Sequence, residues 1–173
     1  MSNTTIVSGQ IATWQSHLQV YFKIIKEVSA KDRPVLVFED DFDLEADAPS
    51  LLKEALSSLP DDWEVFLLGH ANMQCKRVHP NICKALFFYC AFAYMVRNST
   101  VAKKLINWSN TEIGQVADAF WLPYIGNGSL IVYAADPHHI AMQDRQQFGS
   151  DIPASGPISV VKLRNPISKI LKA

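Results

Sequence analysis

The chain has 173 residues, of which 49% are hydrophobic and 19% are charged, and its formal net charge is -1 at pH 7. This length suits one domain with a sizeable core. The near-zero net charge argues against a nucleic-acid-binding protein, because such proteins usually carry a strongly basic face. The first ten residues hold neither a basic cluster nor a long apolar stretch, so we expect no secretory signal peptide. Three cysteines are too few, and odd in number, for a disulfide framework, which favours a reducing, cytoplasmic compartment.

In chain order, the first predicted element is a helix. Apolar residues recur at spacings of three and four from Ile11 to Val28, which predicts a helix over about residues 10–29. The stretch VLVF, residues 35–38, then predicts a short strand that is buried on both faces, as in a parallel sheet. Asp47 is placed to cap a second helix that runs to Leu59. Residues 64–69, EVFLLG, predict a second buried strand.

The second half of the chain continues this alternation. Residues 70–84 are mixed and polar and predict a loop, and residues 85–97 predict one or two strands. The apolar run at residues 85–96 is shorter than the about 20 residues of a membrane-spanning helix. Ser99 or Thr100 is expected to cap a third helix, residues 112–122 predict a fourth, and residues 129–136 predict another strand. Helices alternating with buried strands predict an α/β domain of three layers.

Six carboxylates directly follow the first predicted strand, in the stretch EDDFDLEAD at residues 39–47. Ligands of open α/β sheets bind beyond the carboxyl ends of strands, and adjacent carboxylates repel one another unless they share a cation. Mg²⁺ or Mn²⁺, which prefer oxygen ligands, fits Glu39, Asp40 and Asp41. Asp41 and Asp43 are an alternative pair. The other interpretation is a solvated loop leading into a capped helix, with Glu45 at the surface.

Several segments resemble glycosyltransferase family 25, which includes bacterial lipooligosaccharide galactosyltransferases and collagen galactosyltransferases. VLVFEDDFDLEADAPSLLKEAL resembles the acidic-motif strand and the following helix of that family. Five further segments resemble family motifs and fall in the family's order. They are SGQIATWQSHLQVYFKII, DDWEVFLLG, CAFAYMVRNSTVAKKLI, VADAFWLPYI and VYAADPHHIAMQDRQQFGSDI. The resemblance rests on the order of these segments, which cover about residues 8 to 152.

This resemblance implies a fold and an activity. The implied fold is a GT-A-like, Rossmann-like three-layer α/β domain with a mainly parallel sheet, N-terminally shortened and covering residues 1–157. A basic tail, residues 158–173, would follow it. The implied enzyme transfers a hexose, galactose or glucose, with inversion, from a UDP-sugar to a hydroxyl of a saccharide, a lipooligosaccharide or a protein. The sequence does not fix the donor sugar or the acceptor.

The resemblance also assigns roles to individual residues. Glu39 and Asp41 would hold Mn²⁺ or Mg²⁺ against the diphosphate of the donor, with His139 or, as the alternative, His138 as a further ligand. Asp118 is the candidate base, because inverting transfer needs a carboxylate to take the proton of the acceptor hydroxyl. The remaining matches are the expected donor-binding residues, Ser16, His17 and Asp40, and the closing-motif residues, Gln143, Ser150 and Asp151. A structural hydrogen bond is the alternative role for Ser16 and His17.

Two further expectations concern partners. Family 25 members usually open with a strand unit that lines the nucleotide base pocket, and this unit has no counterpart here. The alternative function is therefore a non-catalytic remnant that acts as a binding module and self-associates through exposed sheet edges. The tail interleaves four basic residues with apolar ones, which predicts peripheral contact with an anionic membrane surface or, alternatively, a solvated terminus.

Overall fold

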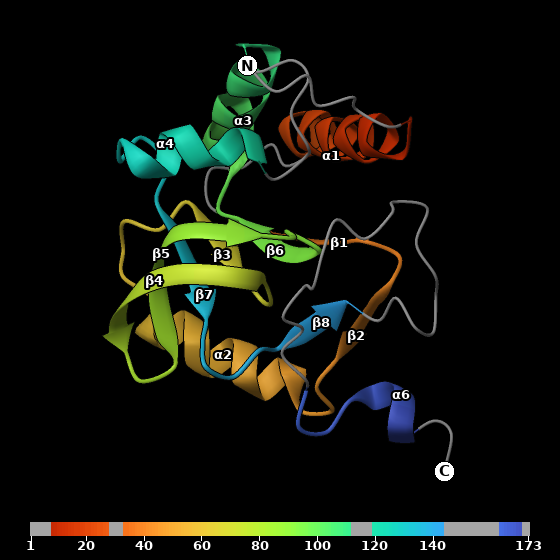
Figure 1. The fold of residues 1–173 in the computed structure, drawn as a ribbon, viewed down its shortest axis with the longest axis vertical. Coiled ribbons are helices and arrows are strands. Elements are labelled where there is room, and N and C mark those ends of the chain that lie inside the picture. The colour runs from red at the N-terminus through yellow and green to blue at the C-terminus, as the bar shows by residue number, and fades with distance from the viewer. Residues whose placement is uncertain (1–7, 28–32, 112–118, 144–162, 171–173) are drawn as a thin grey trace.

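The computed structural model describes residues 8–27, 33–111, 119–143 and 163–170 (Figure 1). Its larger sheet has six strands in the order β1-β6-β3-β7-β5-β4. These strands are β1 (Val35–Phe38), β3 (Val65–Leu67), β4 (Ala71–His79), β5 (Ile82–Tyr89), β6 (Ala93–Val96) and β7 (Val132–Ala135). A smaller antiparallel sheet pairs β2 (Phe42–Leu44) with β8 (Ala141–Gln143).

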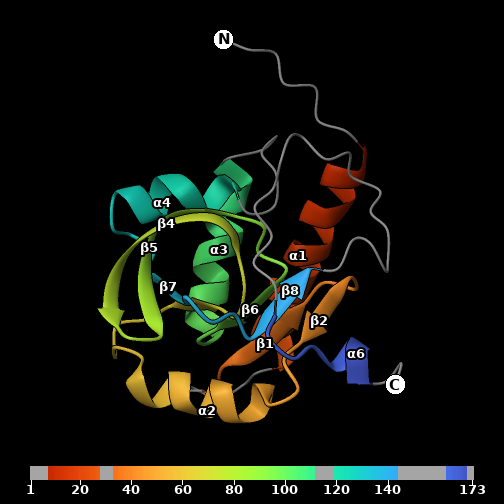
Figure 2. The same cartoon turned by 60° about the horizontal axis from the view of Figure 1, so that its bottom comes forward.

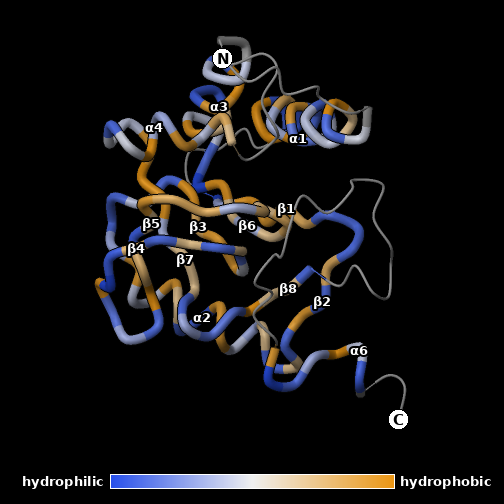
Figure 3. The backbone as a smooth tube through the Cα atoms, viewed as in Figure 1, coloured by the Kyte–Doolittle hydropathy of each residue, from blue (hydrophilic) through white to orange (hydrophobic). Residues whose placement is uncertain are grey.

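Helices cover both faces of the larger sheet, which confirms a mixed α/β domain of three layers (Figures 1 and 2). One face carries α1 (Ser8–Glu27), α3 (Ser99–Thr111), the turn η1 (Ala119–Trp121) and α4 (Leu122–Gly126), and the other carries α2 (Ala48–Ser58). Successive side chains of β3 point to opposite faces of the sheet, so they pack in two hydrophobic cores, one on each face. Val65 and Leu67 pack with α1 and α3, whereas Phe66 packs on the α2 side. In Figure 3 the hydrophobic colours follow the central strands, and hydrophilic residues gather at the turn after β1.

The prediction of a mainly parallel sheet is wrong. Among the described strands, β3 and β7 are the only parallel pair. Strand β6 lies antiparallel between β1 and β3, and β5 pairs antiparallel with both β7 and β4. Buried apolar runs predict strands but carry no information about their direction. The strands β1, β3 and β7 nevertheless run the same way, because β1 and β3 are both antiparallel to β6.

The stretch predicted as a loop, residues 70–84, forms most of a β-hairpin. Strand β4 runs to His79, Pro80 and Asn81 make the turn, and β5 begins at Ile82. Strand β4 lies at the edge of the sheet and is mostly exposed or half-buried, so it lacks the apolar run that marks a central strand. A disulfide joins Cys75 to Cys83 across the hairpin, with a Cα–Cα distance of 5.7 Å. The sequence did not predict this bond, because three cysteines are too few for a disulfide framework.

Strand β1 has the predicted bounds but not the predicted burial. Within the described residues it pairs only with β6, so it is an edge strand. Leu36 is 41% exposed and Phe38 is 36% exposed, whereas Val37 is buried. The composition of VLVF does not distinguish a central strand from an edge strand with one covered face.

The predicted helices agree with the structure more closely. Helix α2 begins after Asp47 as expected, although the Asp47 side chain makes no capping hydrogen bond. Helix α3 is capped one residue earlier than predicted, because the Asn98 side chain accepts hydrogen bonds from the backbone N–H groups of Thr100 and Val101. The fourth predicted helix falls partly outside the described residues, and α4 begins at Leu122. No described helix combines the length and apolar character needed to cross a membrane.

Candidate functional site

The candidate site lies at the end of the sheet that is formed by the carboxyl ends of β1, β3 and β7. Because these strands share one direction, the residues that follow them meet along the same edge. The acidic turn, Glu39 to Asp41, follows β1, His70 follows β3, and Asp136 directly follows β7. This is the side of an α/β sheet on which ligands usually bind.

His17 of α1 connects the acidic turn to the core. A carboxylate can only accept, so the Nε2–H of His17 donates to Glu39 Oε1 at 3.1 Å. The other ring nitrogen, Nδ1, lies 2.7 Å from the hydroxyl of Tyr94 on β6, and this hydroxyl lies 3.1 Å from that of Tyr21. With the proton on Nε2, Nδ1 is left to accept a hydrogen bond from the Tyr94 hydroxyl. Burial, followed by the neighbouring Tyr21 and Glu39, raises the pKa of Tyr94 well above its usual value.

Gln143, at the end of β8, joins two of the predicted metal ligands. Its Nε2–H groups donate to Asp41 Oδ2 at 2.9 Å and to Glu39 Oε2 at 3.4 Å. Glu39 Oε2 and Asp41 Oδ2 thus both lie close to the Gln143 amide nitrogen, and Asp41 is buried. An oxygen-only set of this kind suits a hard cation such as Mn²⁺ or Mg²⁺. The residues present therefore fit the ion that the resemblance implies.

The other acids of the turn have different surroundings. Asp40 is exposed. Asp43 and Glu45 are buried, so the expectation of a surface position for Glu45 is wrong. Asp43 accepts a hydrogen bond from the Ser168 hydroxyl at 2.6 Å. Glu45 accepts hydrogen bonds from the backbone N–H groups of Arg164 and Asn165. These two carboxylates hold part of the predicted tail, with the short helix α6 (Ile167–Ile170), against β2.

Several predicted site residues lie apart from this network or outside the described chain. Ser16 is exposed on α1, and its hydroxyl donates to the carbonyl of Ala12 within the same helix. The structure thus gives Ser16 a local hydrogen bond and gives its neighbour His17 a long-range one. The candidate base Asp118 and the closing-motif residues Ser150 and Asp151 lie outside the described residues.

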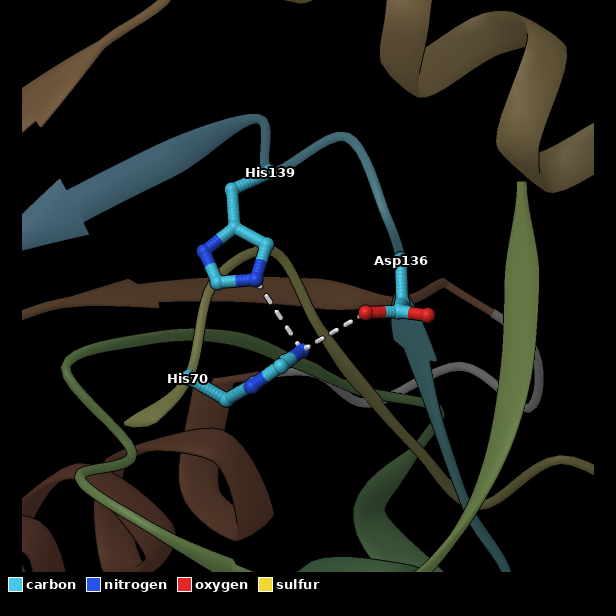
Figure 4. Close-up of side chains that lie close together, drawn as sticks. All are labelled: His70, Asp136 and His139. Atoms are coloured by element: carbon cyan, nitrogen blue, oxygen red, sulfur yellow. Dashed lines mark hydrogen bonds and ion pairs between the residues drawn. The ribbon is translucent and has the colours of Figure 1, made fainter. Parts of the chain in front are cut away.

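His139 lies in a second cluster, with His70 and Asp136 (Figure 4). The Nε2 atoms of the two histidines are 3.1 Å apart, and His70 Nε2 is 3.9 Å from Asp136 Oδ1. Both imidazoles are buried. Burial, reinforced by His139, lowers the pKa of His70 to about 3. Burial lowers the pKa of His139 to about 4, against an opposing effect of Asp136, so both rings are neutral near pH 7.

The backbone explains why these distant residues meet. A Cβ on Gly69 would lie 2.1 Å from the carbonyl oxygen of Ala141, so only glycine allows the first residue of β8 to lie this close to the end of β3. Backbone N–H groups of Ile140 and Ala141 donate to the carbonyl of Leu68, which aligns His139 beside His70. The sequence signal for this cluster is modest: His70 and Asp136 are polar residues placed just after buried strands.

Among the described residues, two groups of three offer ligand atoms within 4.8 Å of one another. One is His70, Asp136 and His139, and the other is Cys75, Cys83 and Asp136. Neither group contains Glu39 or Asp41, so the structure does not bring His139 together with the two carboxylates that the resemblance assigns to the same ion. His138, the alternative ligand, is exposed and contacts Arg164.

No protein-family model matches the chain, and a search of curated proteins finds no match.

Proposed function

We propose that this protein is a metal-dependent inverting glycosyltransferase of the GT-A type, similar to family 25, that moves galactose or glucose from a UDP-sugar to a saccharide, glycolipid or protein hydroxyl. One observation supports this most. His17, Glu39, Asp41, Tyr94 and Gln143 come from four separate segments that resemble family motifs, and they form one connected hydrogen-bond network. Such a convergence around the carboxyl end of β1 is what a shared donor-binding site would require.

The network suits the donor end of such a reaction. Glu39 and Asp41 would hold Mn²⁺ or Mg²⁺, and the bound ion would neutralise charge that develops on the leaving diphosphate. His17 holds Glu39 in place through the bond from Nε2–H, and Gln143 holds both carboxylates. Orientation of this kind is what a metal-binding carboxylate needs from its surroundings. Asp40 is exposed beside these residues and stays the proposed donor contact.

Asp118 stays the proposed base. Its carboxylate would accept the proton of the acceptor hydroxyl while the acceptor oxygen attacks the anomeric carbon of the donor. The bond between that carbon and the diphosphate oxygen breaks on the opposite face, UDP leaves, and the configuration inverts. Replacing Asp118 by Asn should therefore lower transfer while donor binding is retained.

UDP binding and UDP-sugar hydrolysis test this proposal without a known acceptor. We expect calorimetry to detect UDP binding that depends on Mn²⁺, and hydrolysis of UDP-galactose or UDP-glucose that depends on the same ion. Asp41→Asn should weaken UDP binding about tenfold or more, since each 1.4 kcal/mol is a factor of ten. Asp47→Asn is the matched control, because Asp47 is exposed and its side chain makes no capping bond.

The outcomes separate the two hypotheses from the sequence. Metal-dependent binding that fails only in Asp41→Asn supports the transferase. A folded protein that binds neither UDP nor Mn²⁺ would reject it and favour the non-catalytic binding module.

A further inference from the structure

The cluster of His70, Asp136 and His139 is separate in chemistry from the acidic turn. The acidic turn offers only oxygen ligands, whereas this cluster offers two imidazole nitrogens and one carboxylate oxygen. It is also held by different elements. His70 follows β3 and Asp136 follows β7, and these two strands are the one parallel pair of the described sheet. His139 lies two residues before β8, whose first residue, Ala141, lies close against Gly69.

The distances agree with a single small ion held by all three side chains. Two ligands of one tetrahedral zinc ion lie about 3.3 Å apart when each bond is about 2.0 Å long. The two Nε2 atoms are 3.1 Å apart, and the separation of His70 Nε2 and Asp136 Oδ1 is 3.9 Å. All three ligand atoms lie within 4.8 Å of one another. The two imidazoles already have about the required spacing, whereas the 3.9 Å separation exceeds it by about 0.6 Å, so Asp136 would have to move toward the histidines to complete the coordination.

The surroundings keep each ligand in the form that binds a metal. Both imidazoles are at least 94% buried and neutral near pH 7, so each can present a lone pair. Arg77 pairs with Asp136 Oδ2, which leaves Oδ1 directed at His70. An outer partner of this kind orients a metal-binding carboxylate.

A simple hydrogen bond between the two histidines leaves a cost uncompensated. One Nε2 must donate to the other, and His70 Nδ1 stays buried with no hydrogen-bond partner among the described residues, whichever tautomer it takes. A buried polar atom without a partner costs about 1–3 kcal/mol. Ligation of an ion through both Nε2 atoms would fix the proton of each ring on Nδ1 and leave His70 Nδ1 as it is, but it would add a favourable interaction that the histidine pair alone lacks.

We propose that His70, Asp136 and His139 bind one divalent transition-metal ion, with Zn²⁺ the best fit. Two nitrogens and one carboxylate suit zinc and its neighbours in the first transition row, whereas Ca²⁺ and Mg²⁺ prefer an all-oxygen set. Three protein ligands leave a fourth position for water, the pattern of zinc sites that act on a substrate. This site does not depend on the proposed transferase function.

The test is Zn²⁺ titration of the untagged, chelator-treated protein with its disulfide intact. We expect one equivalent of Zn²⁺ to bind, by calorimetry and native mass spectrometry. His139→Asn and Asp136→Asn should each weaken binding about tenfold or more. His138→Asn is the matched control, because His138 is adjacent but exposed, and it should bind Zn²⁺ like the unchanged protein.

Two results would overturn the proposal. One is a folded, unchanged protein that binds no stoichiometric Zn²⁺, and the other is His139→Asn binding Zn²⁺ as tightly as His138→Asn. If His139→Asn fails to fold, the Co²⁺ form of the unchanged protein decides the question. Tetrahedral visible absorption without a sulfur-to-cobalt band supports a His–His–Asp site. An absorption spectrum like that of free Co²⁺ contradicts it.

Discussion

Gln143 donates to Asp41 Oδ2 at 2.9 Å although 102 positions separate the two residues in the chain. The same amide reaches Glu39 at 3.4 Å, so one uncharged donor stands between two carboxylates. A cation in this place would have the same two oxygens as neighbours. A substitution that changes the charge at position 143 therefore tests whether an ion binds between the two carboxylates.

Gln143→Glu should make the protein depend on a cation for its stability. The change replaces the shared donor by a third carboxylate, and like charges in one site repel. In chelator we expect the free energy of unfolding to fall by about 1–3 kcal/mol, because the two carboxylates lose a shared hydrogen-bond donor. Mn²⁺ should restore more stability to the variant than to the unchanged protein in thermal melts. Gln74→Glu, on the exposed part of β4, is the control. Equal responses of both variants to Mn²⁺ would count against the metal site.

Tyr94→Phe should change how stability responds to alkaline pH. The pKa of Tyr94 is raised in the folded protein, so unfolding above the usual tyrosine pKa of about 10 releases a proton and the unchanged protein loses stability as pH rises. Near pH 8 the variant should be less stable by about 1–2 kcal/mol, because His17 Nδ1 loses its partner.

This gap should narrow above pH 10, because the variant has no such proton to release. Urea unfolding at the two pH values measures this difference in stability. The comparison is Tyr89→Phe, which removes a hydroxyl from a residue that is 44% exposed. If the difference in unfolding free energy between Tyr94→Phe and the unchanged protein stays constant with pH, Tyr94 is not the residue whose pKa is raised in the folded protein.

Asp43→Ala should destabilise the fold, whereas Asp47→Ala should have little effect. Asp43 is buried and accepts hydrogen bonds from Ser168, so its loss should cost about 1–3 kcal/mol. Asp47 is exposed and makes no capping bond, and we expect a change within about 0.5 kcal/mol. Urea denaturation checks both. If Mn²⁺ changes the cost of Asp43→Ala, then Asp43 belongs to the cation site and not only to the attachment of the tail.

Reduction of the Cys75–Cys83 disulfide should strengthen zinc binding. The two sulfur atoms lie within 4.8 Å of an Asp136 carboxylate oxygen, and thiolates are strong zinc ligands. A dithiol reductant converts the disulfide to two thiols and is itself oxidised to its disulfide. We expect affinity for Zn²⁺ to rise about tenfold or more, with a new sulfur-to-cobalt band in the Co²⁺ form. Cys75→Ala should remove this gain, and the same gain in that variant would place the effect at another thiol.

Some residues of the hydrogen-bond network could be named from the sequence, because the family resemblance points to individual positions on separate segments. His17 was expected from one motif and Glu39 and Asp41 from another, and the three residues lie in one network. His139 was expected in the same set, but it contacts His70 instead. The spacing of a motif places a residue on a segment, whereas its neighbours depend on which segment crosses it. Here the close approach of the start of β8 to Gly69 brings His139 to the end of β3.

The sequence by itself determined the kinds of elements and most of their places, because hydrophobic periodicity reports local geometry and burial. It indicated the helix that carries His17, the strand before Glu39 and the α/β layering. Only the tertiary structure decided strand direction, the hairpin at residues 71–89, the Cys75–Cys83 bond and the burial of Asp43 and Glu45. These features depend on contacts between residues far apart in the chain, and no local pattern records which distant partner a strand edge or a carboxylate will meet.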